Sequence, residues 1–162
     1  MTTGLARRSL AWPWISTPAR LGLAAVWLVA GATKVGDLAE SARAVNAYQL
    51  MSYDVAKAVG GIQPFLEIAL GLLLVIGLST RLTAAISAAL LVIFTAGIAS
   101  AWARGLRIDC GCFSSGGELG AGRDTEYGLE ILRDLGFLAL AGLLLWRPHT
   151  WYSLDDLLTR KR

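Results

Sequence analysis

Residues Leu82–Ala103, LTAAISAALLVIFTAGIASAWA, form a long apolar run that contains no charged residue. Its length matches the roughly 20 residues that an α-helix needs to cross the hydrocarbon core of a bilayer. Small residues occur along its whole length, and they allow neighbouring helices to approach closely. We therefore predict a membrane-spanning helix here.

Three further segments approach the same length, so we predict spans over residues 19–36, 62–79, 82–103 and 127–146. Lys34 and the Arg133-Asp134 pair interrupt the first and last of these segments. Such charges must reach the membrane surface or face the interior of the bundle. With 55% hydrophobic and only 17% charged residues, the chain exceeds the apolar content of ordinary soluble proteins. The predicted fold is an all-α integral membrane protein, a four-transmembrane-helix bundle that forms a single domain over residues 1–162.

The predicted outer loops are residues 37–61 and 104–126. In the first loop, apolar residues recur at roughly helical intervals, with a break near residues 52–54. This pattern predicts short helices that lie on the outer membrane surface between the first two spans.

Basic residues that flank the spans favour a cell (plasma) membrane location, multi-pass, with both termini cytoplasmic and the two long loops outside. A competing interpretation of the first span is a cleaved signal peptide, because Arg7-Arg8 precedes an apolar stretch that contains Ala30-Gly31-Ala32. The net charge of +3 gives no indication of nucleic-acid binding, because the basic residues gather at the ends of spans beside aromatic residues. Membrane lipid headgroups are the expected neighbours of these cations.

The only two cysteines, Cys110 and Cys112, lie in Asp109-Cys110-Gly111-Cys112-Phe113, shortly after the third predicted span. A disulfide between such close neighbours constrains little of the unfolded chain and is forced toward strained geometry. Strained and exposed disulfides are readily reduced. The spacing therefore favours a redox-active dithiol, with free thiols, a structural loop staple and a soft-metal site such as copper(I) as alternatives.

Other chemistries find little support in the sequence. His149 is the only histidine and is distant from the cysteines in the chain, so no zinc or haem ligand set can be assembled from the pair. No phosphate-binding or dinucleotide-binding glycine motif is present. We predict no metal site.

Ionisable residues at membrane depth form one predicted layer at the level of the cysteines, and they are candidates for tuning the dithiol or for a quinone site. These residues are Lys34, Glu67, Arg104, Arg107, Arg133 and Asp134. A carboxylate at the depth of Glu67 is costly unless it is paired or functional. Ion pairing with Lys34 or Arg133 and a functional role both remain open, and cationic neighbours would also favour a cysteine thiolate.

Four sequence elements resemble the methylamine utilisation protein MauE family within the wider DoxX-like superfamily. They are Val29–Lys34, Asn46–Leu50, Pro64–Glu67 with Gly71, and Asp109–Phe113. The similarity extends from Arg20 to Trp146, and its most specific part is Cys-Gly-Cys-Phe. The chain departs from the family pattern at Ser114, where glycine is usual.

The resemblance implies an integral membrane protein that works with a thioredoxin-like extracytoplasmic partner in forming or maintaining disulfides of exported proteins. Together, the residues and the resemblance predict thiol-disulfide exchange at Cys110 and Cys112. A second electron carrier is then required, either a membrane quinone or a separate protein. Whether the chain is itself an enzyme stays open, as do its client and its oligomeric state. The competing function is a non-catalytic membrane scaffold or assembly subunit.

Overall fold

The computed structural model describes residues 3–109, 117–118, 125–147, 150 and 153–155, with side chains from Trp14 onward except at residues 117–118. Five helices account for most of these residues: α1 (Thr3–Val35), α2 (Leu38–Ala47), α3 (Tyr53–Ile76), α4 (Thr80–Ala103) and α5 (Tyr127–Trp146). Two short antiparallel strands, β1 (Ile108–Asp109) and β2 (Gly117–Glu118), lie between α4 and α5 in the sequence. The protein is therefore mostly helical, as the sequence predicts.

Three of the helices are long and apolar enough to cross a membrane: Trp14–Val35 within α1, and all of α3 and α4. Large apolar side chains on their outer faces are exposed, among them Ile62, Leu82 and Ile93. Exposed apolar faces of this extent are expected where lipid replaces water as the solvent. These features are consistent with a membrane protein. Helix α5 carries Glu130, Arg133 and Asp134 and does not meet the same criterion of length and apolar composition.

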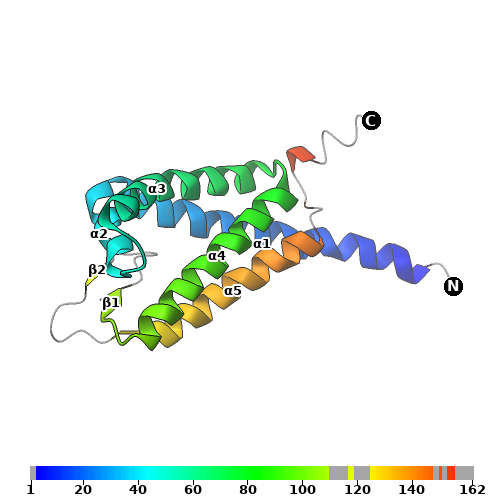
Figure 1. The fold of residues 1–162 in the computed structure, drawn as a ribbon. Coiled ribbons are helices and arrows are strands. Elements are labelled where there is room, and N and C mark those ends of the chain that lie inside the picture. Colours follow the sequence, from blue (N-terminus) through cyan, green and yellow to red (C-terminus); the bar gives the residue numbers. More distant parts are fainter. Residues whose placement is uncertain (1–2, 110–116, 119–124, 148–149, 151–152, 156–162) are drawn as a thin grey trace.

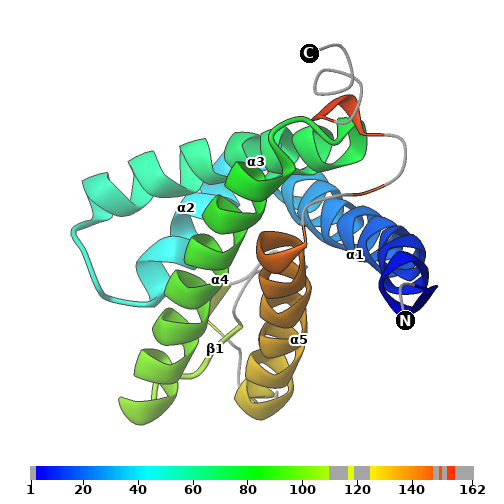
Figure 2. The same ribbon diagram turned by 90° about the vertical axis from the view of Figure 1, so that its right-hand side faces the viewer.

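The helices form two pairs that cross at an angle: α1 lies beside α3, and α4 lies beside α5 (Figures 1 and 2). Successive long helices run in opposite directions along the bundle. The α3–α4 turn and the described C-terminal residues therefore lie at one end. Helix α2 and both strands lie at the other end (Figure 1).

Residues 53–61 belong to α3 in the structure, whereas the sequence suggested a separate surface helix. The helix continues through Gly60 and Gly61. Helix α2 packs against α3 at Gly60, where the absence of a Cβ leaves room for the Ala42 backbone. Only one short helix, α2, thus stands between the first two long helices in the described structure. Asp37 caps its first turn by accepting a hydrogen bond from the Glu40 backbone N–H at 2.8 Å.

The turn between α3 and α4 is tight and is held by the C-terminal segment. Gly77 ends α3 in the left-handed conformation (φ 67°), which glycine adopts without steric cost. The two carboxylate oxygens of Asp155 accept hydrogen bonds from the backbone N–H groups of Ser79 and Thr80, each at 2.8 Å. A residue from the far end of the chain therefore caps the first turn of α4.

Trp27 joins the two helix pairs at the centre of the core. Its indole Nε1 donates a hydrogen bond to Ser87 Oγ at 2.9 Å, and its ring meets Phe94 edge-on with centroids 6.4 Å apart. Leu23, Leu70 and other fully buried apolar residues surround it. The indole N–H is thus satisfied inside an apolar core, where an unpaired donor would be costly.

We expect Gly60→Ala to destabilise the protein by about 1–3 kcal/mol, a typical cost of overpacking. A Cβ at Gly60 would lie 2.7 Å from both the Cα and the backbone N of Ala42, so α2 itself must move. Gly61→Ala is the matched control, because a Cβ there meets nothing within 4 Å and alanine is the better helix former. Thermal unfolding in detergent measures both effects, and equal stability of the two variants would contradict the described packing of α2.

Candidate functional site

The two cysteines predicted to be reactive, Cys110 and Cys112, lie outside the described residues, but the strands on either side of them are described. In this short hairpin Ile108 pairs with Glu118 and Asp109 pairs with Gly117. Residues 110–116 therefore connect two hydrogen-bonded strands. The segment that carries both cysteines therefore starts after β1 and ends before β2, which pair with each other.

Tyr127, the first residue of α5, anchors the strand that leads into Cys110. Its hydroxyl accepts a hydrogen bond from the Ile108 backbone N–H at 3.0 Å and donates one to the Leu106 carbonyl. Ile108 is buried, and the ring of Trp102 lies 6.2 Å from that of Tyr127. Strand β2 in turn packs against α2. The base of the hairpin is thus fixed to α2, α4 and α5.

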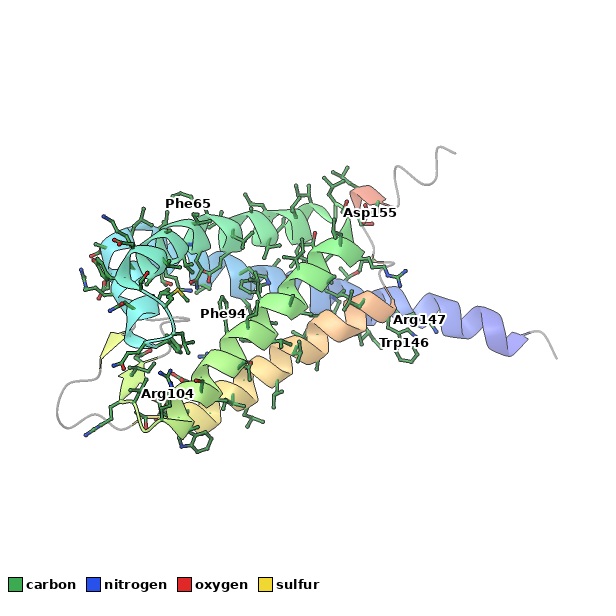
Figure 3. All side chains as sticks on the ribbon, in the orientation of Figure 1. Phe65, Phe94, Arg104, Trp146, Arg147 and Asp155 are labelled. Atoms are coloured by element: carbon green, nitrogen blue, oxygen red, sulfur yellow. The ribbon has the colours of Figure 1, made fainter. Side chains whose placement is uncertain are left out.

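Arg104 fastens the end of α4 to the end of α2. Its guanidinium donates hydrogen bonds to the backbone carbonyls of Tyr48 and Gln49, and its Nε donates to the Ser100 carbonyl at 3.2 Å (Figure 3 labels Arg104). Arg104 and Arg107 are exposed, so neither belongs to a buried polar layer. Both arginines follow the last turn of α4, at the end of the bundle that carries the hairpin.

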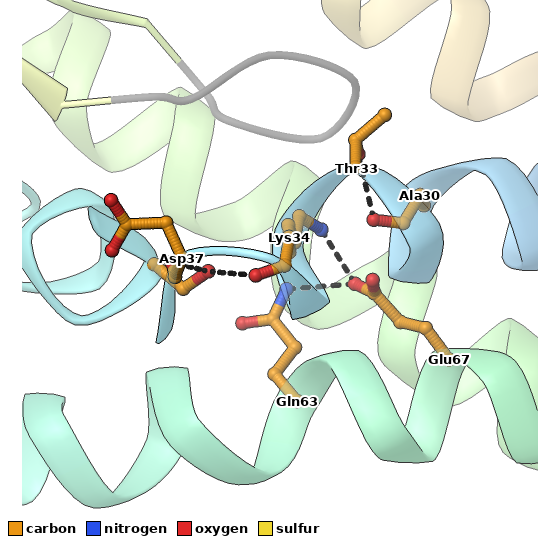
Figure 4. Close-up of polar contacts among 7 residues, drawn as sticks. Ala30, Thr33, Lys34, Asp37, Gln63 and Glu67 are labelled. Carbon is orange, nitrogen blue, oxygen red and sulfur yellow. Dashed lines mark hydrogen bonds and ion pairs between the residues drawn. The ribbon is translucent and has the colours of Figure 1, made fainter. Parts of the chain in front are cut away.

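Lys34 and Glu67 form a buried ion pair between α1 and α3. The Lys34 Nζ lies 2.7 Å from Glu67 Oε1, and the two side chains are only 8% and 1% exposed. Gln63 Nε2, one turn before Glu67, donates to the same oxygen at 2.8 Å (Figure 4). Of the two cations weighed for Glu67 from the sequence, the structure brings Lys34 to it.

Asp134 enters the same region from α5. Its side chain is buried, and its Oδ1 accepts hydrogen bonds from Arg133 Nε and Nη2, both at 3.3 Å. The Arg133 side chain is partly exposed, so this neighbouring pair extends from the core toward the surface. Asp134 Oδ2 and Glu67 Oε2 are both buried and have no hydrogen-bond partner among the described residues.

A small cavity lies where α1, α3, α4 and α5 converge, and Lys34, Glu67 and Asp134 contribute to its wall. The remaining wall is apolar: Val26, Trp27, Ala30, Leu91, Phe94 and Phe137. The space open to the centre of a water molecule is about 20 Å³, enough for about one water.

The structure therefore gathers Lys34, Glu67 and Asp134 around one cavity, with Arg133 behind Asp134, and leaves Arg104 and Arg107 apart. Sequence reasoning missed Gln63 and Tyr127. Gln63 was detectable, since residues four apart share one face of a helix. Tyr127 gives no local signal, because its partners lie about 20 residues earlier in the chain.

Residues 12–147 match the family model described as Methylamine utilisation protein MauE. The match covers most of the 162-residue chain, including all of α2 to α5 and the Cys-Gly-Cys segment. No curated protein and no solved structure gives a significant match to the chain.

Proposed function

Since the chain belongs to the MauE family, a membrane protein family involved in methylamine utilisation, we propose that it is a membrane-bound thiol-disulfide redox protein. Cys110 and Cys112 are its reactive pair. The wider relationship to DoxX-like proteins is part of the same proposal.

The observation that carries the proposal is the pairing of β1 with β2 on either side of the cysteines. The strand pair already closes the segment at Asp109 and Gly117. A further bond between Cys110 and Cys112 would close only a very short loop inside it, and short loops contribute little stability. The pair is therefore better suited to exchange than to stapling the loop.

The exchange proceeds in two displacements. A thiolate of one cysteine attacks a sulfur of a partner disulfide, which forms a mixed disulfide and releases the other partner sulfur as a thiolate. The second cysteine thiolate then attacks the sulfur of the first. This step forms the Cys110–Cys112 disulfide and releases the partner as a dithiol. Two electrons pass from this protein to the partner, and the reverse sequence oxidises the partner.

The proposed partner is a thioredoxin-like extracytoplasmic protein, and a membrane quinone or a separate protein supplies or removes the electrons. In this proposal a quinone, if it is the carrier, is reached from the end of the bundle that carries the hairpin. In this proposal the roles of Lys34, Glu67 and Asp134 are to build and hold the bundle beneath the hairpin. Arg104 fixes the end of α4 next to it.

We also propose that α5 is a fourth span, with both termini cytoplasmic and α2 and the hairpin on the outer surface of the cell membrane. Leu129, Leu132 and Leu135 on α5 are exposed, as lipid-facing residues would be, while Asp134 points inward. The beginning of α1 and the described C-terminal residues lie toward the same end of the bundle (Figure 1). An even number of crossings accounts for that arrangement.

A non-catalytic scaffold or assembly subunit is the second candidate. It is favoured by the Lys34–Glu67 ion pair, which joins α1 to α3 without involving the cysteines. In that case the bundle would retain its full biological function when the cysteines are replaced.

The disulfide and the orientation are tested together by labelling intact cells with a membrane-impermeant thiol reagent, with and without prior treatment with an impermeant reductant. We expect Cys110 or Cys112 to be labelled strongly after reduction and weakly before it, because the oxidising outer compartment maintains the disulfide. A variant with both cysteines replaced by serine is the control for background.

Equal labelling without the reductant would show free thiols and contradict the redox proposal. Labelling only after the cells are opened would place the hairpin on the cytoplasmic side. Copper bound to the wild type and absent from the double serine variant would favour a metal site instead.

A further inference from the structure

The backbone of β1 is bonded along both of its edges. One edge pairs with β2, with Ile108 opposite Glu118. On the other edge, Tyr127 Oη accepts a hydrogen bond from the Ile108 N–H at 3.0 Å and donates one to the Leu106 carbonyl. A neighbouring parallel strand would bond the same two groups, one on each side of Arg107, through its own N–H and carbonyl. A single hydroxyl from α5 therefore takes the place of a third strand.

The ring of Tyr127 is held independently of its hydroxyl. Tyr127 is only 4% exposed, and it packs in one apolar cluster with Ile98 and Ala101 of α4, Ala47 of α2 and Ile108. Close packing of this kind fixes the plane of the ring and with it the position of the hydroxyl oxygen. The hydroxyl therefore sets where the backbone of β1 lies relative to the ends of α4 and α5.

This placement matters because Ile108 lies two residues before Cys110 in the sequence. Consecutive Cα atoms are only about 3.8 Å apart, so a shift of β1 carries the start of the cysteine segment with it. A partner protein must contact the end of the bundle and reach a cysteine sulfur at the same time, which makes exchange sensitive to small displacements. A small reductant needs access to the sulfur alone.

We infer that Tyr127 is a positioning residue for thiol-disulfide exchange with a protein partner. This inference rests on the proposed function of Cys110 and Cys112. The Tyr127 hydroxyl takes no part in the chemistry. It holds β1 in one place on the bundle, so that a docked partner meets the cysteines in the geometry that its own sulfur atoms require.

The test compares Tyr127→Phe with Tyr53→Phe in the full-length, oxidised protein in detergent. Phenylalanine at position 127 retains the packed ring and removes only the hydroxyl. Tyr53 is the matched control, because its side chain is 54% exposed at the start of α3. Reduced thioredoxin and dithiothreitol are the two probes. In either reaction a thiolate of the reductant attacks the Cys110–Cys112 disulfide, and its second thiol then releases it as an oxidised disulfide, so that two electrons pass to the protein.

Maleimide labelling over time measures the free thiols and gives a rate constant for each probe. We expect Tyr127→Phe to react with thioredoxin roughly tenfold more slowly than the wild type, because misplacement alone slows oriented reactions. Its rate with dithiothreitol should be unchanged, and Tyr53→Phe should match the wild type with both probes. Hydrogen exchange at the Ile108 N–H should become faster in Tyr127→Phe, because that N–H loses its acceptor.

The outcomes separate this inference from the function on which it rests. A wild type that neither probe reduces has no reducible disulfide and contradicts the proposed function itself. With a reducible wild type, the role of Tyr127 is overturned by an unchanged thioredoxin rate in Tyr127→Phe. Equal slowing with both probes overturns it too, since the hydroxyl would then act on the thiols and not on their placement.

Two further results count against the inference. Loss of cooperative unfolding in Tyr127→Phe would make the hydroxyl a requirement of the whole fold rather than of the hairpin. A wild type that dithiothreitol reduces and thioredoxin does not would show that the hairpin is not placed for a partner of that fold.

Discussion

Glu67→Leu is expected to destabilise the protein by about 3–5 kcal/mol, because it leaves the ammonium of Lys34 buried without its counter-charge. The ion pair is almost inaccessible, and Gln63 also loses its acceptor. Thermal or denaturant unfolding in detergent measures the loss. Glu67→Gln retains the side-chain shape and one acceptor, so it should cost less than the leucine variant.

The double variant Lys34→Met/Glu67→Leu separates the ion pair from other effects of the substitution. Replacing both members of a buried pair by apolar residues is often neutral or stabilising, so the double variant should be more stable than Glu67→Leu alone. If the stability losses of Glu67→Leu alone and of Lys34→Met alone simply add up in the double variant, the pair contributes nothing through coupling. If every variant accumulates and exchanges thiols normally, Glu67 has no functional role.

Cys110→Ser and Cys112→Ser are each expected to abolish thiol-disulfide exchange and to leave the fold nearly unchanged. The chemical effect is complete, because one cysteine must attack and the other must resolve the mixed disulfide. The stability effect is small. Even a 15-residue loop gains only about 3 kcal/mol from a disulfide, and the loop between these residues is far shorter.

The serine variant that lacks the resolving cysteine should accumulate a mixed disulfide with a thioredoxin-like partner, visible as a reducible adduct on a non-reducing gel. The other variant, which lacks the attacking cysteine, is the matched control and should give none. A large fall in melting temperature together with no adduct from either variant would favour the structural staple. That result would support the scaffold function.

The membrane helices can be read from the sequence because apolar length is a property of each segment by itself. Leu82–Ala103 needs no knowledge of its neighbours, and α4 covers it with two added residues at its start. The start of the second long helix was harder to predict, because α3 begins at Tyr53 whereas the predicted span begins at residue 62. Glycine in a sequence is typical of a helix end, but Gly60 lies within α3. A side chain does not fit there, because the Ala42 backbone of α2 approaches closely.

The candidate site was only partly predictable for a similar reason. A buried carboxylate predicts a partner, but the choice between Lys34 and Arg133 depends on how each helix is rotated about its axis. The strands β1 and β2 are two residues each, too short for an alternating pattern to emerge. Their pairing depends on anchors such as Tyr127, which the local sequence does not reveal.

The cap that Asp155 places on α4 has a consequence for the biogenesis of the protein. The ribosome completes α4 some 50 residues before it reaches Asp155, so the first turn of α4 enters the membrane with the N–H groups of Ser79 and Thr80 not yet capped by that carboxylate. The final arrangement of the α3–α4 turn therefore forms after synthesis has passed the last long helix. Reporter proteins fused directly after Trp146 to map topology would omit this cap, and fusions that retain Asp155 preserve it.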